Sequence, residues 1–547
     1  MATVVGMDHG QRAHDALARL TPAQREAVSA TEPRLAVLAG AGAGKTTVLT
    51  LRVHEMVASG IDPFNLLVVT FSRRAAQELR TRLWQLGVEG VRAGTFHATA
   101  LELLEVRRAE QGLAPPRILP DRRRSLARML ESIGRTLPRS APAALDTEIS
   151  WAKGHGLEPR TYEDGARRAG RRTSLAPKVV AELWSRYEDG KRRSAMLDFD
   201  DLIVDAAEAL RDPTFAAAIH WRTRHVLIDE FQDVSPMQFR LVERLLTPST
   251  TLFCVGDPNQ SIYGFNGADP ALLATLGTSF PDLRTIALDD NHRSTPEIVR
   301  AAAAVLPPGD RRPSTASRST GRPPTIVACD DDQAEATMVA ATIAAERRPG
   351  ATWGSTAVLA RTNAQLARIA TACEAAGVPH RLLAPDVSDA DTSALDVSPR
   401  QRGWQEDEVE DPDAVVLATF HRSKGLEWQR VFVIGVSDGL VPHAAATTPA
   451  AVAEEQRLLY VALTRAGHDL TVSWARRRDG EERRGSPERT VSPLLHAMAE
   501  ELARQEAEAL PAPVERATAH LASMRRRVAE ARREREDGPG EGPWTTT

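Results

Sequence analysis

Short apolar runs, each followed by a turn and then by a helical pattern, recur in the first half of the chain. They lie at 35–38, 66–71, 225–228 and 252–256. Runs of this length without polar alternation are typical of strands in a parallel sheet, where both faces are covered. The stretch 72–83, after the second run, carries apolar residues at helical spacing. This alternation predicts an α/β fold in which helices flank parallel sheets.

The pattern changes between about 102 and 198, where arginine-rich amphipathic helices are interrupted by prolines. Trp151, Trp184 and Tyr187 would supply a small core, and no catalytic group of side chains is evident there. We therefore expect a helical subdomain inserted at 102–198. Its basic faces are interpreted as solvated surface, with a contact to DNA as the alternative.

The composition is that of a soluble globular protein, with 42% hydrophobic and 26% charged residues. A chain of 547 residues is too long for one core and indicates about three or four domains. The formal net charge is only −4, so a nucleic acid would have to bind at a local basic groove. Cys254, Cys329 and Cys373 show no zinc, iron–sulfur or disulfide spacing. No export segment or run of membrane length occurs, and we expect a cytoplasmic protein.

A loop of glycine and alanine follows the first apolar run and precedes a helical pattern. Backbone N–H groups of such a loop, together with the helix dipole, bind phosphate oxygens. Lys45 would reach the β- and γ-phosphates of ATP, and Thr46 would bind Mg²⁺. The alternative is a glycine-rich turn without a ligand. The expected nucleotide contacts are Ala39 (where glycine is usual), Gly40, Ala41, Gly42, Ala43, Gly44, Lys45, Thr46 and Thr47.

Lysine is rare in this chain, which uses arginine for nearly all of its positive charge. It occurs only at positions 45, 153, 178, 191 and 424. A compact ammonium group fits beside a phosphate, where a planar guanidinium would crowd the anion. Lys45 therefore suits a phosphate site, and Lys424 becomes a second residue of interest.

Gln24 lies in a helix that begins just before the phosphate loop, with Thr21 as the expected N-cap and Pro22 in the first turn. Its amide could pair with the adenine edge, because it offers one donor and one acceptor side. The alternative is an exposed helical glutamine.

Two carboxylates, Asp229 and Glu230, directly follow the apolar run at 225–228. At the carboxyl end of a strand, Asp229 can hold Mg²⁺ directly or through water. Glu230 is then left to orient and activate the attacking water. Gln260, in the polar turn after the run at 252–256, is placed to sense the γ-phosphate. Together with the phosphate loop, these residues favour nucleotide hydrolysis over a chance pair of acids.

Aromatic and basic side chains also follow predicted strands, where they could contact a nucleic acid. Phe71, Arg73 and His97 come after two of the strands, and Tyr263 and Phe265 follow a third. Bases stack on such rings, each stacked base contributing about 1–3 kcal/mol. The alternative for Phe71 is an ordinary place in the core.

Seven motifs in order resemble those of UvrD/Rep-type superfamily 1A DNA helicases. They are Thr-Pro-Ala-Gln-Arg-Glu-Ala-Val from 21, Ala-Gly-Ala-Gly-Lys-Thr from 41, Ile-Asp-Glu-Phe-Gln-Asp from 228, Gly-Asp-Pro-Asn-Gln-Ser-Ile-Tyr from 256, Asn-His-Arg-Ser from 291, Thr-Phe-His-Arg-Ser-Lys-Gly-Leu-Glu-Trp from 419 and Leu-Tyr-Val-Ala-Leu-Thr-Arg-Ala from 459. The resemblance covers residues 18–475. It implies two RecA-like domains whose cleft binds Mg-ATP, and 3′-to-5′ movement along single-stranded DNA.

The resemblance also assigns residues and domains. Arg293 and Arg465 resemble arginine fingers, which neutralise charge on the γ-phosphoryl group. Glu427 resembles a carboxylate near the nucleotide's sugar and phosphates, and Lys424 and His421 resemble groups on the DNA and coupling side. A surface ion pair is the alternative for any of the arginines. The expected RecA-like domains are 1–101 with 199–285 (domain 1A) and 286–480 (domain 2A), and 481–547 would be a charged tail, part helix and part disordered.

Four features depart from the family pattern. His292 replaces a tyrosine and Thr47 replaces an arginine, which in relatives sandwich the adenine, so the grip on the base is expected to differ. Asn266 replaces an arginine near the DNA. The stretch 383–413, where relatives insert a subdomain called 2B, is acidic and lacks apolar periodicity. About thirty residues are too few for a domain, and we infer that 2B is missing.

The sequence thus predicts an ATP-dependent DNA helicase that acts on single-stranded DNA or a junction in repair, recombination or replication. A translocase that displaces proteins without unwinding, and a nucleotide-gated DNA-binding protein with little turnover, are the alternatives. RNA as the track is not excluded, because stacking does not sense a 2′-hydroxyl. A fused nuclease is not expected, since no lysine follows Lys424. The tail is interpreted as a solvated helix, with a protein partner as the alternative.

Overall fold

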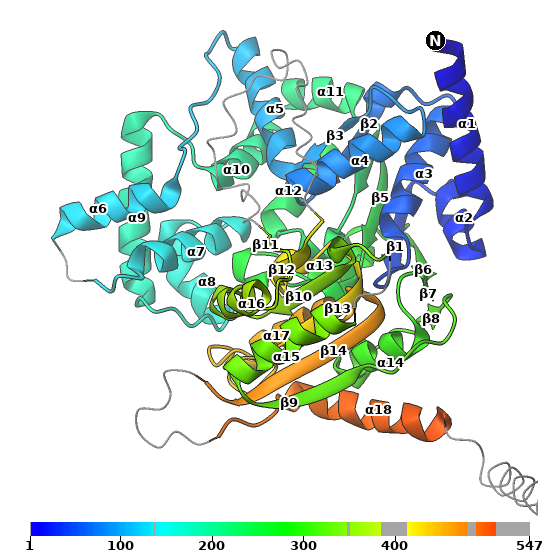
Figure 1. The fold of residues 1–547 in the computed structure, drawn as a ribbon. Helices are drawn as coiled ribbons and strands as arrows, with labels where there is room; N and C mark the ends of the chain where they lie inside the picture. The colour runs from blue at the N-terminus through cyan, green and yellow to red at the C-terminus, as the bar shows by residue number, and fades with distance from the viewer. Residues whose placement is uncertain (1, 135–136, 347–349, 384–412, 479–487, 510–547) are drawn as a thin grey trace, which may run out of the picture.

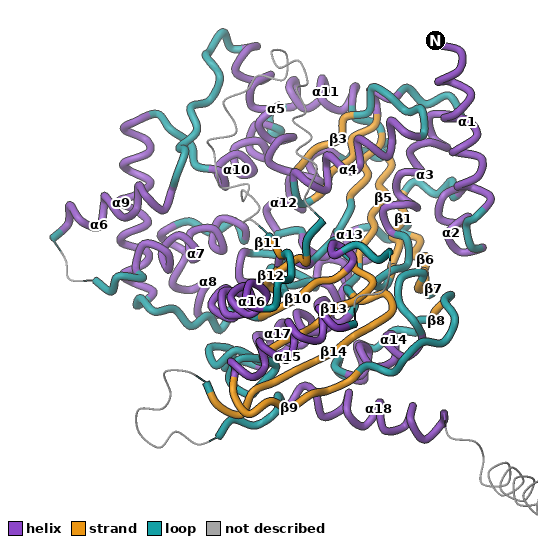
Figure 2. The backbone as a smooth tube through the Cα atoms, in the orientation of Figure 1, coloured by secondary structure: helices purple, strands orange, loops and turns teal. Residues whose placement is uncertain are grey.

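The computed structural model describes residues 2–134, 137–346, 350–383, 413–478 and 488–509. Two lobes, each built on a six-stranded sheet, face one another, and a group of helices projects from the first lobe (Figure 1). Both sheets are parallel, and helices flank them (Figure 2). The α/β class predicted from the alternating pattern is therefore confirmed. Within the described residues, no helix is both long enough and apolar enough to cross a membrane.

The first sheet has the strand order β3-β2-β4-β5-β1-β6. Its strands are β1 (Arg34–Ala39), β2 (Leu66–Thr70), β3 (Arg92–Thr95), β4 (His225–Ile228), β5 (Thr251–Gly256) and β6 (Arg284–Leu288). The four apolar runs of the sequence thus form β1, β2, β4 and β5. Because all strands are parallel, the phosphate loop after β1 and the acid pair after β4 lie at one edge of the sheet. The sheet extends to Leu288, beyond the expected domain boundary at 285.

Two apolar clusters cover the faces of this sheet. One contains Leu49 and Leu79, and the other contains Leu103 and Leu202. The helices of this lobe are α1 (Ala2–Ala18), α2 (Pro22–Ser29), α3 (Lys45–Ala58), α4 (Arg73–Gln85), α5 (Phe96–Glu110), α10 (Phe199–Ala209), α11 (Pro213–Arg222), α12 (Pro236–Leu245) and α13 (Ala271–Ser279). As predicted, Thr21 is the N-cap of α2.

The inserted helices are α6 (Arg122–Ile133), α7 (Ala141–Gly154), α8 (Tyr162–Arg168) and α9 (Pro177–Ser194). Their core contains Trp151, Trp184 and Tyr187, as the sequence indicates, and also Tyr162. The insertion begins after α5, which continues to Glu110 because its apolar side packs against α10.

The second sheet has the order β11-β12-β10-β13-β14-β9. Its strands are β9 (Thr325–Asp331), β10 (Thr356–Ala360), β11 (His380–Leu382), β12 (Val415–Thr419), β13 (Trp428–Ile434) and β14 (Ala466–Arg477), and its helices are α14 (Pro296–Ala304), α15 (Asp332–Ala345), α16 (Asn363–Ala375) and α17 (Pro449–Leu463). A small pair, β7 (Asp290–Asn291) and β8 (Thr315–Ala316), follows β6.

The first part of the expected tail packs as a helix of the second lobe. Helix α18 (His496–Ala509) packs against α14, and Met498 and Leu502 are buried in the second lobe's core. The apolar side of α18 explains why it is not a solvated tail. Residues 510–547 and most of the predicted linker (384–412) lie outside the described residues.

Candidate nucleotide and DNA sites

The phosphate loop joins β1 to α3 in a conformation that requires glycine at two positions. Gly42 has φ +71° and Gly44 has φ +80°, in the left-handed region that other residues avoid. Lys45 opens α3, and its Nζ donates to the carbonyls of Ala39 at 3.3 Å and Gly40 at 3.4 Å. The ammonium group therefore lies over the mouth of the loop, where a phosphate would be cradled.

The segment that begins with Asn291 closes one side of this loop. Asn291 Nδ2 donates to the carbonyl of Ala41 at 2.8 Å, and the N–H of His292 donates to the carbonyl of Gly42 at 3.0 Å. A Cβ on Gly42 would lie 2.8 Å from Cβ of Arg293, so a larger residue would push this segment away. The contact brings Arg293, which precedes the second sheet in the chain, beside the phosphate loop.

Gln24 and His292 meet at the far end of the loop. Gln24 Nε2 donates to the carbonyl of Ala43 at 3.0 Å and lies 3.4 Å from Nε2 of His292, while its Oε1 accepts from the N–H of Thr21 at 3.0 Å. The structure thus places Gln24 on the loop wall beside His292, and Thr47 lies in the first turn of the helix that follows. Pairing of Gln24 with an adenine edge stays a prediction.

The acid pair lies at the end of β4, facing Lys45. Burial and the adjacent Glu230 raise the pKa of Asp229 to about 7. Burial opposes the charge of Glu230 as well, but Lys45 and Lys424 together hold the pKa of Glu230 below its ordinary value. Glu230 also has φ +51°, a conformation that non-glycine residues seldom adopt and that often marks a functional site. The two carboxylates therefore have different environments, which suits two different roles.

Oxygen ligands of the kind that Mg²⁺ prefers are available at this edge. The Thr46 hydroxyl in the first turn of α3 and the buried carboxylate of Asp229 are such ligands. A divalent cation would offset the cost of burying a charged Asp229. The residues present therefore fit the ion that the sequence predicts.

Two guanidinium groups reach this site from the second lobe. Arg465 is only 1% exposed, and its Nη2 donates to Oε1 of Gln260 in the first lobe at 3.3 Å. Arg293 Nε donates to Glu427 at 2.6 Å, and its Nη1 donates to the carbonyl of Thr464 at 3.2 Å. Burial and the neighbouring Arg293 lower the pKa of Arg465, as expected where two cations converge. The arrangement brings together all of the residues predicted to act on the γ-phosphate.

The sequence analysis did not single out Asp233, which ends the Asp-Glu-Phe-Gln-Asp segment. It is 1% exposed and accepts a hydrogen bond from Lys424 of the second lobe, whose Nζ also lies 3.9 Å from Glu230. Burial raises the pKa of Asp233 to about 7. The rarity of lysine marked Lys424, but its acidic partner could only be found in three dimensions.

A row of aromatic rings leads away from the nucleotide site. Phe71 stacks on Tyr263 with ring centroids 4.9 Å apart, Tyr263 lies 6.2 Å from Phe265, and Phe265 meets His421 edge-on at 5.6 Å. Lys424 Nζ lies 5.2 Å from the centre of the Tyr263 ring. Because Tyr263 contacts Phe71 and Lys424, Phe265, which is 45% exposed, is the ring best placed to receive a base. The structure brings four of the predicted DNA contacts into this one row.

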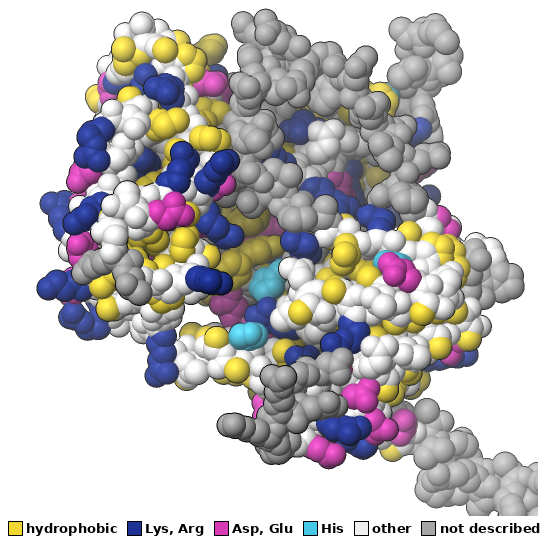
Figure 3. Space-filling model, turned by 60° about the vertical axis from the view of Figure 1, so that its left-hand side comes forward, with side chains coloured by type: hydrophobic (Ala, Val, Ile, Leu, Met, Phe, Trp, Pro, Cys, Tyr) yellow, Lys and Arg dark blue, Asp and Glu magenta, His cyan; other side chains and the backbone are white. Residues whose placement is uncertain are grey.

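Phe71, Tyr263 and Phe265 line a groove of about 1020 Å³ between the first sheet and the inserted helices, together with Arg73 and His97. In the space-filling view, Lys and Arg side chains gather around a hollow with hydrophobic side chains inside (Figure 3). His97 stacks on Phe199 with centroids 4.0 Å apart, and burial lowers the pKa of His97 to about 4. His97 is therefore a neutral ring at neutral pH and adds no positive charge to the groove.

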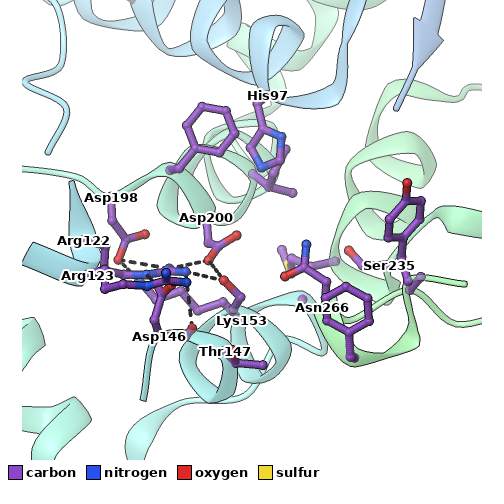
Figure 4. A pocket seen from close by; sticks show the side chains of 18 of the residues that line it. His97, Arg122, Arg123, Asp146, Thr147, Lys153, Asp198, Asp200, Ser235 and Asn266 are labelled. Atoms are coloured by element: carbon purple, nitrogen blue, oxygen red, sulfur yellow. Dashed lines mark hydrogen bonds and ion pairs between the residues drawn. The ribbon is translucent and has the colours of Figure 1, made fainter. Parts of the chain in front are cut away.

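The wall formed by the inserted helices carries charged side chains (Figure 4). The basic residues lining it are Lys153 and four arginines, Arg122, Arg123, Arg124 and Arg139. Arg122 is held by Asp146 at 2.6 Å and Asp200 at 2.5 Å, so part of this charge is neutralised within the protein. The basic faces were interpreted as solvated surface, whereas the structure places these four arginines at the groove.

Comparisons with known proteins agree with this geometry. The UvrD/REP helicase N-terminal domain family matches residues 20–281, and the UvrD-like helicase C-terminal domain family matches 286–385 and 402–477. A Mycobacterium tuberculosis protein named ATP-dependent DNA helicase UvrD2 is 33% identical over 84% of this chain and 79% of its own length. A Leuconostoc citreum protein named ATP-dependent DNA helicase PcrA is 32% identical over 66% of this chain and 49% of its own length. A Bacillus subtilis protein named putative ATP-dependent DNA helicase YjcD is 27% identical over 86% of this chain and 80% of its own length.

Proposed function

This chain belongs to the UvrD/REP helicase family, and we propose that it is an ATP-dependent DNA helicase that uses Mg-ATP hydrolysis to move 3′ to 5′ along single-stranded DNA. The observation that carries the proposal is the meeting of the two lobes at the phosphate loop. Lys45 and Glu230 come from one lobe and Arg465 from the other. A site completed by both lobes links the state of the nucleotide to the distance between them.

In the proposed reaction, the phosphate loop and Lys45 hold the β- and γ-phosphates. Glu230 orients and activates a water molecule that attacks the γ-phosphorus, and Gln260 senses the γ-phosphate. Arg293 and Arg465 neutralise the charge that develops on the transferred group, and Glu427, which binds Arg293, would face the nucleotide's sugar and phosphates. Thr46 and Asp229 would hold the Mg²⁺, which supplies charge stabilisation at the phosphate oxygens.

The proposed track for DNA is the aromatic row and the basic groove beside it. Single-stranded binding sites combine stacking rings with positive charge along the backbone. Phe265 is the exposed ring, and Arg73 and the arginines of the inserted helices line the same groove. A role in repair, recombination or replication, on single strands or junctions, follows from a motor of this kind.

A translocase that displaces bound proteins without unwinding is a second candidate. It is favoured by the short connection between Leu383 and Asp413, which is too small for an additional domain. Release of a labelled strand from a partial duplex, measured beside release of streptavidin from a biotinylated single strand, separates the two functions. Unwinding with a 3′ overhang, and not with a 5′ overhang, would support the proposed helicase and its polarity.

The direct test is ATP hydrolysis by the purified chain with and without single-stranded oligonucleotides, in the presence of Mg²⁺. We expect turnover that rises at least tenfold with DNA, is lost with EDTA, and is weaker with RNA of the same sequence. Equal turnover with and without DNA would refute a DNA-driven motor. Negligible turnover under both conditions would favour a nucleotide-gated binding protein.

A further inference from the structure

The segment 260–265 follows β5 of the first sheet but is docked on the second lobe. Ile262 is fully buried in the same apolar cluster as Val433 of β13 and Leu459 of α17. Tyr263 packs against that cluster as well. The segment therefore packs against the second lobe as well as the first, where Ser261 Oγ donates to the carbonyl of Gln232 at 3.0 Å and Tyr263 stacks on Phe71.

Polar contacts from the second lobe hold the backbone of this segment at successive points. Lys424 Nζ donates to the carbonyl of Gln260 at 2.6 Å, and Arg457 Nε donates to the carbonyl of Ser261 at 2.8 Å. The carboxylate of Glu454 lies against the backbone of Gly264, and the N–H groups of Gly264 and Phe265 partly offset the rise that burial causes in the pKa of Glu454.

The carboxylate of Glu454 lies close to Gly264. A Cβ at this position would lie 2.8 Å from Oε2 of Glu454. A side chain at Gly264 would therefore displace the carboxylate of Glu454. This closeness shows that Glu454 and the segment are fitted to each other.

Glu454 and Arg457 lie on α17, the helix that ends at Leu463, just before Arg465. The helix from Glu454 to its end at Leu463 is about 14 Å long, and a helix is stiff over that length. One rigid element thus ends two residues before the arginine at the nucleotide site and carries, further back, the groups that lie against the backbone beside Phe265. A shift of this helix relative to the first sheet would therefore move both the arginine at the nucleotide site and the backbone beside Phe265.

We propose that Glu454 and Arg457 are positioning residues that fasten the segment 260–265 to α17, so that Phe265 follows the second lobe when the nucleotide state changes. This inference rests on the proposed function for the role of Phe265. Neither residue touches the expected phosphate position; each acts through the backbone that it holds. Removing either should therefore uncouple DNA from hydrolysis while leaving DNA-free hydrolysis intact.

The test compares Glu454→Ala, Glu454→Gln and Arg457→Ala with Glu208→Gln, which changes a surface residue paired with Arg211. Hydrogen exchange, followed by mass spectrometry of peptides covering 260–268, reports the fastening directly. We expect exchange in this segment to rise about tenfold in Glu454→Ala, because the carboxylate that lies against the backbone at Gly264 is removed. Glu454→Gln keeps one acceptor oxygen and should recover part of the protection.

Hydrolysis assays then test the consequence. We expect DNA-free turnover within twofold of the unmodified chain, and stimulation by DNA reduced at least fivefold, in both alanine variants. Unchanged exchange would overturn the fastening, and an equal loss of DNA-free and DNA-stimulated turnover would overturn the positioning role. An unmodified chain without DNA stimulation would overturn the proposed function instead, and the exchange measurement would still decide whether Glu454 holds the segment.

Discussion

Arg465 in the second lobe donates to Gln260 in the first lobe, with Nη2 and Oε1 3.3 Å apart. The other N–H groups of the same guanidinium are held by the carbonyls of Val461 at 2.9 Å and Leu426 at 3.0 Å. Because these contacts fix its plane, the group is held in one orientation between the lobes. Such preorganised charge is what stabilises a phosphoryl transition state.

We predict that Arg465→Lys lowers kcat for ATP by roughly 10³-fold while changing nucleotide affinity far less. Lysine keeps the charge but lacks the planar fork that spans Gln260 and the carbonyls. Single-turnover hydrolysis and binding of a fluorescent ATP analogue measure the two effects. Arg211→Lys, at an exposed ion pair, is the matched control. A loss of binding equal to the loss of rate would assign Arg465 to ground-state binding.

We predict that Lys45→Ala and Glu230→Gln abolish turnover but largely spare DNA binding. Lys45 faces the phosphate cradle, and Glu230 is held as a carboxylate by Lys45 and Lys424. The proposed DNA track lies on other residues, so oligonucleotide affinity measured by anisotropy should change by less than about threefold. Turnover that survives in either variant would refute the assignment of the hydrolytic site.

We predict that Phe265→Ala weakens binding of single-stranded DNA by about 1–3 kcal/mol, which is the worth of one stacked base. The salt dependence of binding should stay the same, because no phosphate contact is removed. Tyr263→Phe is the matched control, since it keeps the ring that stacks on Phe71. Affinities at several salt concentrations provide the measurement, and a changed slope with unchanged affinity at low salt would argue against stacking.

Much of the first lobe was predictable because its strands are short apolar runs, and a recognisable polar or glycine-rich motif follows several of them. β1, β2, β4 and β5 coincide with those runs, and the parallel arrangement alone brings Lys45 and Asp229 to one edge. The core of the inserted helices was equally predictable, since large aromatic residues seldom stay exposed when helices pack.

Other features required the three-dimensional arrangement. The partner of Lys424 is Asp233, which lies 191 residues away in the sequence. The role of Lys153 could likewise not be inferred from the sequence, because its carboxylate partners come from other helices. Helix α18 was taken for part of a charged tail because Met498 and Leu502 are few among many charges, yet they are enough to dock it.

We predict that acidification destabilises the unmodified chain more than it destabilises His97→Phe. Burial, with a smaller contribution from Arg73 and Arg122 that Asp200 and Asp198 oppose, lowers the pKa of His97 to about 4, against 6.5 in the unfolded chain. The unfolded state therefore binds more protons between these values, and stability is lost as the pH falls from 6.5 toward 4. At pH 5.5 the loss from this residue is about 1.4 kcal/mol.

The measurement is the midpoint of thermal unfolding at pH 7.5 and pH 5.5 for both chains. Phenylalanine cannot titrate and keeps a ring for stacking on Phe199. The difference between the two midpoints should be smaller in the variant. Equal differences would mean that His97 is already protonated in the folded protein.

Lys153 and Lys191, two of the five lysines, lie in a buried cluster between the inserted helices and α10. Lys153 Nζ lies 2.8 Å from Asp198, 2.5 Å from Asp201 and 2.9 Å from Glu188. Burial opposes its charge, but these carboxylates raise the pKa of Lys153 well above its usual value. The cluster therefore binds the inserted helices to the first lobe through charges that are largely shielded from water.

We predict that Lys153→Met lowers the free energy of unfolding by about 3–5 kcal/mol, because it leaves buried carboxylates without a full set of cations. Adding Asp201→Asn removes one of those charges and should restore part of the loss, which a double-mutant cycle in urea measures. The exposed control Arg211→Ala should cost less than about 0.5 kcal/mol. A Lys153→Met chain as stable as that control would mean that the carboxylates are protonated or hydrated, and that packing alone holds the inserted helices in place.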